Sequence, residues 1–192
     1  MAGGGAVNRG PHTGSGTEAA ASDLNGPQRK SKLSDFDFSE IARLQIPPAA
    51  GIANYAVFDK DDALAVHGSL PTFTKSFQPD EVRELIDIFA QASAPAVSQA
   101  ELRENSKQIT LAGTQYVVSG PRGAQHPVEI ATLHAEDGES GKRDVLFAAP
   151  TATLLLVFQA AEGANTEEKT DAKEGLWAAV RSFAFALSEK GL

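Results

Sequence analysis

The spacing of apolar residues along the chain predicts three long helices. Residues 38–46, within the segment SDFDFSEIARLQI, carry apolar side chains at intervals of three or four until two prolines end the helix. The segment QPDEVRELIDIFAQAS at 78–93 has a proline at its first helical position, acidic residues in its first turn and one apolar stripe. A last helix over 172–190 repeats apolar side chains every three or four residues up to Gly191.

Short apolar or alternating runs bounded by turn residues predict seven strands. The run LLLVF at 154–158 is apolar on both faces, which is typical of a central strand that is covered on each side. Because most of the intervening turns are short, neighbouring strands should be antiparallel. The predicted strands are 54–58, 63–68, 108–112, 115–119, 128–134, 144–149 and 153–159.

This order of elements predicts an α+β domain. A single antiparallel sheet should carry the helices 38–46 and 172–190 side by side on one face, and the helix 79–92 on the other. Residues 1–33 hold seven of the 17 glycines and almost no large apolar side chains. Such a segment buries too little surface to offset its ordering entropy, so we predict a disordered tail at 1–33 and one domain at 34–192.

Charge and composition narrow the classes of partner. The net charge is −8, and residues 1–33 contribute +2 from four basic and two acidic residues, which leaves −10 for 34–192. A body this acidic argues against nucleic acid and anionic membranes as partners. The longest apolar run is too short to span a bilayer, and we find no pattern of a signal peptide. With no cysteine in the chain, we expect a cytoplasmic protein.

No motif for catalysis or for cofactor binding is found in the sequence. It lacks a G-x-S-x-G turn, a phosphate-binding loop and a dinucleotide-binding glycine motif. The four histidines show no metal-ligand spacing, and His67 and His134, at strand ends, are interpreted as ordinary solvent-edge residues. We therefore predict a binding protein rather than an enzyme, without a cofactor or a metal.

Four segments, in the same order, resemble profilin, the small protein that binds actin monomers. They are LAVHGSLPTF at 64–73, FQPDEVRELIDIF at 77–89, QITLAGTQYVVSG at 108–120 and LSEKGL at 187–192. The resemblance extends over residues 34–192 and agrees with the predicted order of helices and strands. It implies a monomeric cytoplasmic protein of the cytoskeleton that binds monomeric actin and regulates actin polymerisation.

The resemblance also implies where actin would bind. The actin-binding face of the family is built from the later strands and the first half of the last helix, here approximately 128–147 and 173–181. The cations available on that face are Lys142, Arg143, Lys173 and Arg181. Phosphoinositide binding is not expected, because Ala148-Ala149 replace the paired lysines of many profilins and the turn before them is acidic.

Profilins bind proline-rich ligands between their terminal helices, with aromatic rings that stack on the ligand. Two positions at which the family carries such rings hold Leu64 and Ala186 in this chain. The aromatic residues that remain near this site are Phe36, Phe38 and Tyr55. We therefore expect weak or absent binding of proline-rich peptides.

A second interpretation is a scaffold module of the roadblock or longin type, which binds small GTPases or motor complexes. It shares the order of helix, hairpin, helix, sheet and helix. The number of strands after the second long helix separates the two, with about three in roadblock modules and five predicted here.

Overall fold

The described part of the chain contains four α-helices and one short 3-10 helix. The protein was analysed as a computed structural model that describes residues 33, 35–92, 107–119, 129–135, 144–163 and 170–192, without the side chains of 92 and 170–173. The α-helices are α2 (Phe38–Gln45), α3 (Pro71–Ser76), α4 (Pro79–Ala92) and α6 (Thr170–Glu189), and the 3-10 helix is η1 (Pro48–Ala50). None of the described helices is long and apolar enough to span a membrane.

Seven strands form one sheet in the order β2-β1-β7-β6-β5-β4-β3. Every neighbouring pair is antiparallel, as the short turns predicted. The first long strand, β1, pairs with the last strand, β7, so that Tyr55 lies opposite Phe158 and Val57 opposite Leu156. The strands are β1 (Ile52–Asp59), β2 (Ala65–Gly68), β3 (Lys107–Leu111), β4 (Thr114–Ser119), β5 (Ala131–Ala135), β6 (Val145–Pro150) and β7 (Leu154–Ala160).

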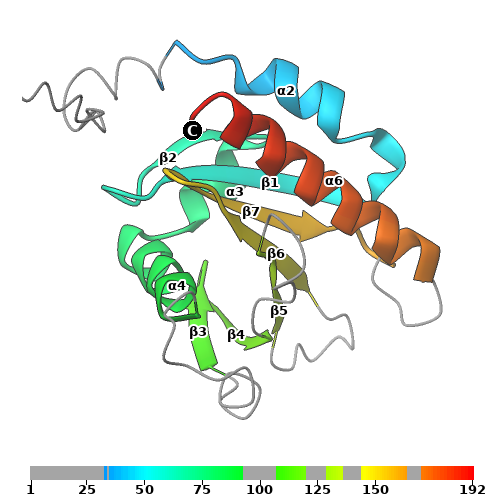
Figure 1. Cartoon of the computed structure of the whole chain (residues 1–192). Coiled ribbons are helices and arrows are strands. Elements are labelled where there is room, and N and C mark those ends of the chain that lie inside the picture. The colour runs from blue at the N-terminus through cyan, green and yellow to red at the C-terminus, as the bar shows by residue number, and fades with distance from the viewer. Residues whose placement is uncertain (1–32, 34, 93–106, 120–128, 136–143, 164–169) are drawn as a thin grey trace, which may run out of the picture.

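Both faces of the sheet are covered by helices, and the terminal helices share one face (Figure 1). On the α6 face, α2 and α6 contact each other, and α6 packs on β6 and β7. On the α4 face, α3 packs on β1 and β2, and α4 packs on β3. The predicted α+β architecture is therefore confirmed, including the side-by-side terminal helices. Five strands follow α4, as the resemblance to profilin implies and the roadblock interpretation does not.

The central strand β7 explains why the molecule has two apolar cores. Its side chains alternate across the sheet, and residues 154–158 are all at most 1% exposed. Leu154, Leu156 and Phe158 join the core under α2 and α6, whereas Leu155 and Val157 join the core under α4. A strand that is apolar at every position can serve both layers at once, which is what the run LLLVF predicted.

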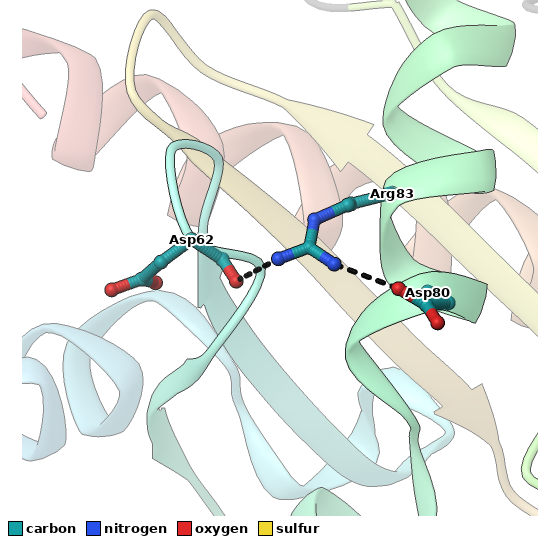
Figure 2. A network of polar contacts seen from close by, with 3 residues as sticks. All are labelled: Asp62, Asp80 and Arg83. Carbon is teal, nitrogen blue, oxygen red and sulfur yellow. Dashed lines mark hydrogen bonds and ion pairs between the residues drawn. The ribbon is translucent and has the colours of Figure 1, made fainter.

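The start of α4 is attached to the β1–β2 turn through Arg83. The guanidinium of Arg83 donates to Asp80 Oδ1 at 2.7 Å and to the main-chain oxygen of Asp62 at 3.3 Å, as Figure 2 shows. Asp80 and Arg83 are mostly exposed, so the pair itself adds little stability. The bond to Asp62 links α4 to the turn between the first two strands.

Glu81 links the same end of α4 to the β3–β4 hairpin. Its Oε2 accepts hydrogen bonds from the main-chain N–H of Gln78 at 2.9 Å and of Ala112 at 3.0 Å. The first bond satisfies a free N–H at the helix start, as in a capping box. The second holds the tip of the hairpin, where Ala112 and Gly113 both have positive φ, 53° and 76°. This two-residue turn lies against the start of α4.

Some boundaries differ from the prediction. Residues 71–76 form the short helix α3, which was not predicted, and two strands begin later than expected, β2 at Ala65 and β5 at Ala131. The predicted disordered tail lies outside the described residues except for Leu33. That side chain is 5% exposed and belongs to the core on the α6 face, together with Phe38 and Ala42 of α2.

Candidate protein-binding surfaces

The first candidate surface is an aromatic seam where α2 meets the sheet edge, formed by Phe36, Phe38, Tyr55 and His67. The ring of Phe38 stacks on the imidazole of His67, with centroids 5.4 Å apart and planes inclined by 16°. Phe36 meets Phe38 edge to face at 4.8 Å. The ring of Phe38 is therefore already in contact with two side chains of the protein itself.

Tyr55 connects the seam to α6 and to the centre of the sheet. Its Oη lies 3.0 Å from Nε2 of His67, and the two share a hydrogen bond whose direction depends on the imidazole tautomer. Its ring lies 5.6 Å from Phe183 of α6 and 6.4 Å from Phe158 of β7, measured between centroids. Tyr55 thus presents an apolar body to the core and a polar tip to β2.

Burial determines how much of the seam is open to a ligand. Phe38 is only 2% exposed, so it is a core residue rather than a surface for binding. Phe36, Tyr55 and His67 are half-buried. Of the two positions where the resemblance expects further rings, Leu64 is 51% exposed and Ala186 is half-buried. The seam is a packed cluster with a small exposed rim.

The polar groups of the seam are held neutral by burial. Burial lowers the pKa of His67 from its ordinary value, and the carboxylate of Asp37 offsets part of that shift. Burial likewise raises the pKa of Tyr55. The neutral imidazole can stack on Phe38 and hydrogen-bond Tyr55 without carrying a charge into the seam. His67 was interpreted from sequence as an ordinary edge residue, and nothing in the sequence indicated its stack on Phe38.

The second candidate surface is the predicted actin-binding face. Lys142 and Arg143 lie outside the described residues, and Lys173 lies in the first turn of α6, where side chains are not described. Arg181 is half-buried and lies near the middle of the same helix.

Arg181 lies over the ring of Trp177, one helical turn earlier. The guanidinium carbon is 5.6 Å from the ring centroid, which is a cation–π distance. The Trp177 ring in turn meets Phe147 of β6 edge to face at 5.9 Å. The ring of Trp177 is half-buried and packs against the border of the core. Its pairing with Arg181 follows from their spacing of four along a helix.

The described residues contain no group of three or more histidine, aspartate or glutamate side chains that is placed to hold a metal ion. Tyr55 and His67 of the seam, and Arg181 of the predicted actin-binding face, each contact an aromatic ring.

Comparison with known proteins matches solved structures only, since no family model and no curated sequence matches the chain. Mouse profilin IIa, in a complex with a double repeat from the FH1 domain of mDia1, has a TM-score of 0.54 and 12% identity. The match covers 82% of this chain and 100% of that one. Rat profilin 2a has a TM-score of 0.53 and 15% identity, and the match covers 80% of this chain and 95% of that one. The chain therefore has a profilin-like fold.

Proposed function

We propose that the protein binds monomeric actin and regulates actin polymerisation in the cytoplasm, without enzymatic activity. The observation that carries the proposal is the profilin-like fold. The match to mouse profilin IIa covers 82% of this chain and 100% of that one. The four sequence segments that resemble the family support the same assignment. The binding face would comprise the later strands and the first half of α6, with Arg181 as its described cation.

Within this proposal the protein acts as a monomer. It binds the other ligands of the family weakly or not at all. Binding of proline-rich peptides is weak because the seam is filled by its own side chains. Phosphoinositides and nucleic acid are not partners, since residues 34–192 carry a charge of −10 once the +2 of residues 1–33 is taken from the total of −8.

Actin polymerisation assays test the proposal directly. The purified protein should slow spontaneous polymerisation of pyrene-labelled actin in a concentration-dependent manner, because bound monomers are withdrawn from nucleation. If the contact is partly electrostatic, Lys142→Glu combined with Arg143→Glu should weaken it, and raised salt should reproduce the loss in the unmodified protein. The matched control is Lys75→Glu, an exposed cation on α3 outside the proposed face.

The unmodified protein tests whether actin is bound, and the double variant tests where on the protein it is bound. No effect of the unmodified protein on polymerisation, and no binding to actin monomers, would refute actin binding. Retained binding of unchanged affinity in the double variant would instead place the interface away from residues 142–143.

A further inference from the structure

The sign of the charge along the chain reverses at Leu33. The segment LSDFDFSEIA at 33–42 holds three acidic residues and no basic one. The segment QRKSK at 28–32 holds no acidic residue and three basic ones, namely Arg29, Lys30 and Lys32. Two stretches of opposite charge therefore meet next to a residue whose side chain belongs to the core.

Leu33 fixes the point from which the basic segment starts. Its side chain is 5% exposed and shares the core on the α6 face with Phe38. Its main-chain oxygen accepts a hydrogen bond from the N–H of Phe36 at 3.4 Å, which closes a turn just before α2. Five residues span at most about 18 Å when extended. The segment 28–32 is therefore tethered close to the aromatic seam, of which Phe36 and Phe38 are part.

The exposed border of the seam, which we call the seam rim, has the chemistry of a cation site. It comprises two half-buried rings and two exposed carboxylates, namely Phe36, Tyr55, Asp35 and Asp37. Aromatic rings attract the side chains of arginine and lysine, and carboxylates form charge-assisted hydrogen bonds with them. Asp37 lies close enough to His67 to act on the pKa of the imidazole, which places negative charge at the seam itself.

His67 does not repel a cation at the rim near neutral pH. Burial lowers the pKa of its imidazole below 6.5, so the ring is uncharged there. A proline-rich ligand has no charge to pair with the carboxylates of the rim, whereas a basic segment can use both the rings and the carboxylates. The composition of the rim therefore favours a basic ligand over a proline-rich one.

We propose that the seam rim binds a basic peptide segment, and that its occupant is the chain's own segment 28–32. The cations of the segment pair with the two carboxylates and lie against the two rings. Exposed ion pairs are individually weak, but the tether at Leu33 makes the contact intramolecular and so raises the effective concentration of the segment. The docked segment covers the open part of the seam and competes with other ligands there. This inference is independent of actin binding.

A spin label tests the contact in the full chain. The chain has no cysteine, so Ser31→Cys gives a single site for a nitroxide. The label should enhance the relaxation of the amide protons of Tyr55 and His67, which lie far from residue 31 in the sequence. Replacement of Arg29, Lys30 and Lys32 by alanine in the labelled protein should lower these paramagnetic relaxation rates at least about threefold, and raised salt should do the same.

Substitutions on the domain test the position of the contact. Asp35→Asn combined with Asp37→Asn removes both carboxylates from the rim and should lower the same relaxation rates. The helix start is preserved, because Asp37 caps α2 by accepting from the N–H of Glu40 at 3.0 Å, and asparagine caps equally well. The matched control is Asp80→Asn combined with Asp87→Asn, two exposed carboxylates on α4. This control should leave the rates unchanged.

Two outcomes would overturn the proposal. Equal relaxation rates in the labelled protein and in its alanine variant would show that the cations do not hold the segment 28–32 at the seam. Rates that fall in the alanine variant but not in the double asparagine variant of the rim would place the contact elsewhere on the domain. Thermal unfolding of each variant verifies that the domain is intact.

Discussion

Ala112 adopts a backbone conformation that disfavours any side chain. Its φ is 53°, in the left-handed region, and the adjacent Gly113 has a φ of 76°. A two-residue hairpin turn of this kind requires positive φ at both positions, and only glycine accepts it without strain. Ala112 is exposed, so its methyl group makes no core contact that would be lost on removal.

Ala112→Gly should therefore stabilise the domain by about 0.5–1 kcal/mol. This value is the backbone strain that is relieved, minus the cost of the greater conformational freedom of glycine in the unfolded chain. Gly113→Ala should destabilise it by about 1–2 kcal/mol. A Cβ at Gly113 would meet nothing within 4 Å, so this change tests backbone strain alone. Urea unfolding of both variants measures the two shifts. A stabilised Gly113→Ala protein would contradict the assigned turn.

His67 gives the stability of the domain a dependence on pH. Burial lowers its pKa in the folded state below the ordinary 6.5, despite the opposing effect of Asp37. Above pH 6.5 His67 is neutral in both the folded and the unfolded state, so its contribution to the free energy of unfolding is fully present. As the pH falls below 6.5 the unfolded chain binds the proton first, so the free energy of unfolding decreases until the folded pKa is passed.

Unfolding in urea at pH 7.5 and at pH 5.5 should show this decrease, and His67→Gln should reduce it, because glutamine does not titrate. The comparison is between the two pH values within each protein, so a general loss of stability in the variant does not affect the result. Equal decreases in both proteins would assign the pH dependence to other groups.

Among the elements, those with a repeating pattern could be predicted and those without one could not. The helix α4 and the strand β7 each carry an uninterrupted apolar pattern, and both were found close to their predicted limits. The helix α3 has six residues and no buried side chain, so no periodicity exposed it. The pairing of β1 with β7 joins residues about 100 positions apart, such as Tyr55 and Phe158, and no local pattern encodes it.

The candidate surfaces follow the same rule. Phe36, Phe38 and Tyr55 could be proposed from the resemblance because aromatic types are visible in a sequence. The stack of His67 on Phe38 could not be predicted in this way. It requires β2 to pair with β1 and α2 to lie over both strands. The spacing of Trp177 and Arg181 was visible in the sequence, but it did not indicate that Nε1 of Trp177 and Nε of Arg181 are buried without a hydrogen-bond partner among the described residues.

Leu33 is the first residue of the described part of the chain, and it joins the core. Its side chain is 5% exposed and contributes to the core on the α6 face. Leu33→Ala should destabilise the protein by about 2 kcal/mol, at the low end for buried leucines because the site lies near a chain end. In a domain of this size, that corresponds to a fall in Tm of roughly 4–8 °C.

Removal of residues 1–32, which leaves Leu33 in place, should change Tm by less than about 2 °C if the predicted tail buries little surface. Thermal unfolding followed by circular dichroism compares the two variants with the full chain. A larger fall in the truncated protein than in Leu33→Ala would show that the tail itself contributes to the fold.

At the scale of the whole molecule, α6 separates the two candidate surfaces. Its seam flank is filled: Phe183 meets Tyr55, which bonds to His67, which stacks on Phe38. On its opposite flank Arg181 lies over the half-buried ring of Trp177, and neither Nε1 of Trp177 nor Nε of Arg181 has a hydrogen-bond partner among the described residues. The same helix thus completes the core at the seam and borders the predicted actin-binding face on its other side. This asymmetry predicts that binding of actin and of proline-rich ligands is unequal.

The last prediction follows from the filled seam. Stacking on a proline helix requires flat ring faces, but Phe38 is only 2% exposed and Leu64 and Ala186 supply no ring. Two missing rings, at roughly 1 kcal/mol each, correspond to a loss of about tenfold to a hundredfold in affinity. Calorimetric titration with an oligoproline peptide should therefore give weak or no binding. Calorimetry is preferable to tryptophan fluorescence, because Trp177 packs on β6 and not in the seam.

Restoring the rings provides the positive test of this explanation. Leu64→Trp combined with Ala186→Tyr should raise the affinity for oligoproline by at least about tenfold, since the resemblance implies a ring at both positions and neither is fully buried. The matched control is Ala178→Tyr, which adds the same ring to an exposed position of α6 outside the seam. If the unmodified protein bound oligoproline tightly, Phe36 and Tyr55 would form a sufficient platform by themselves. If the restored variant bound no better than the control, the missing rings would not be the cause.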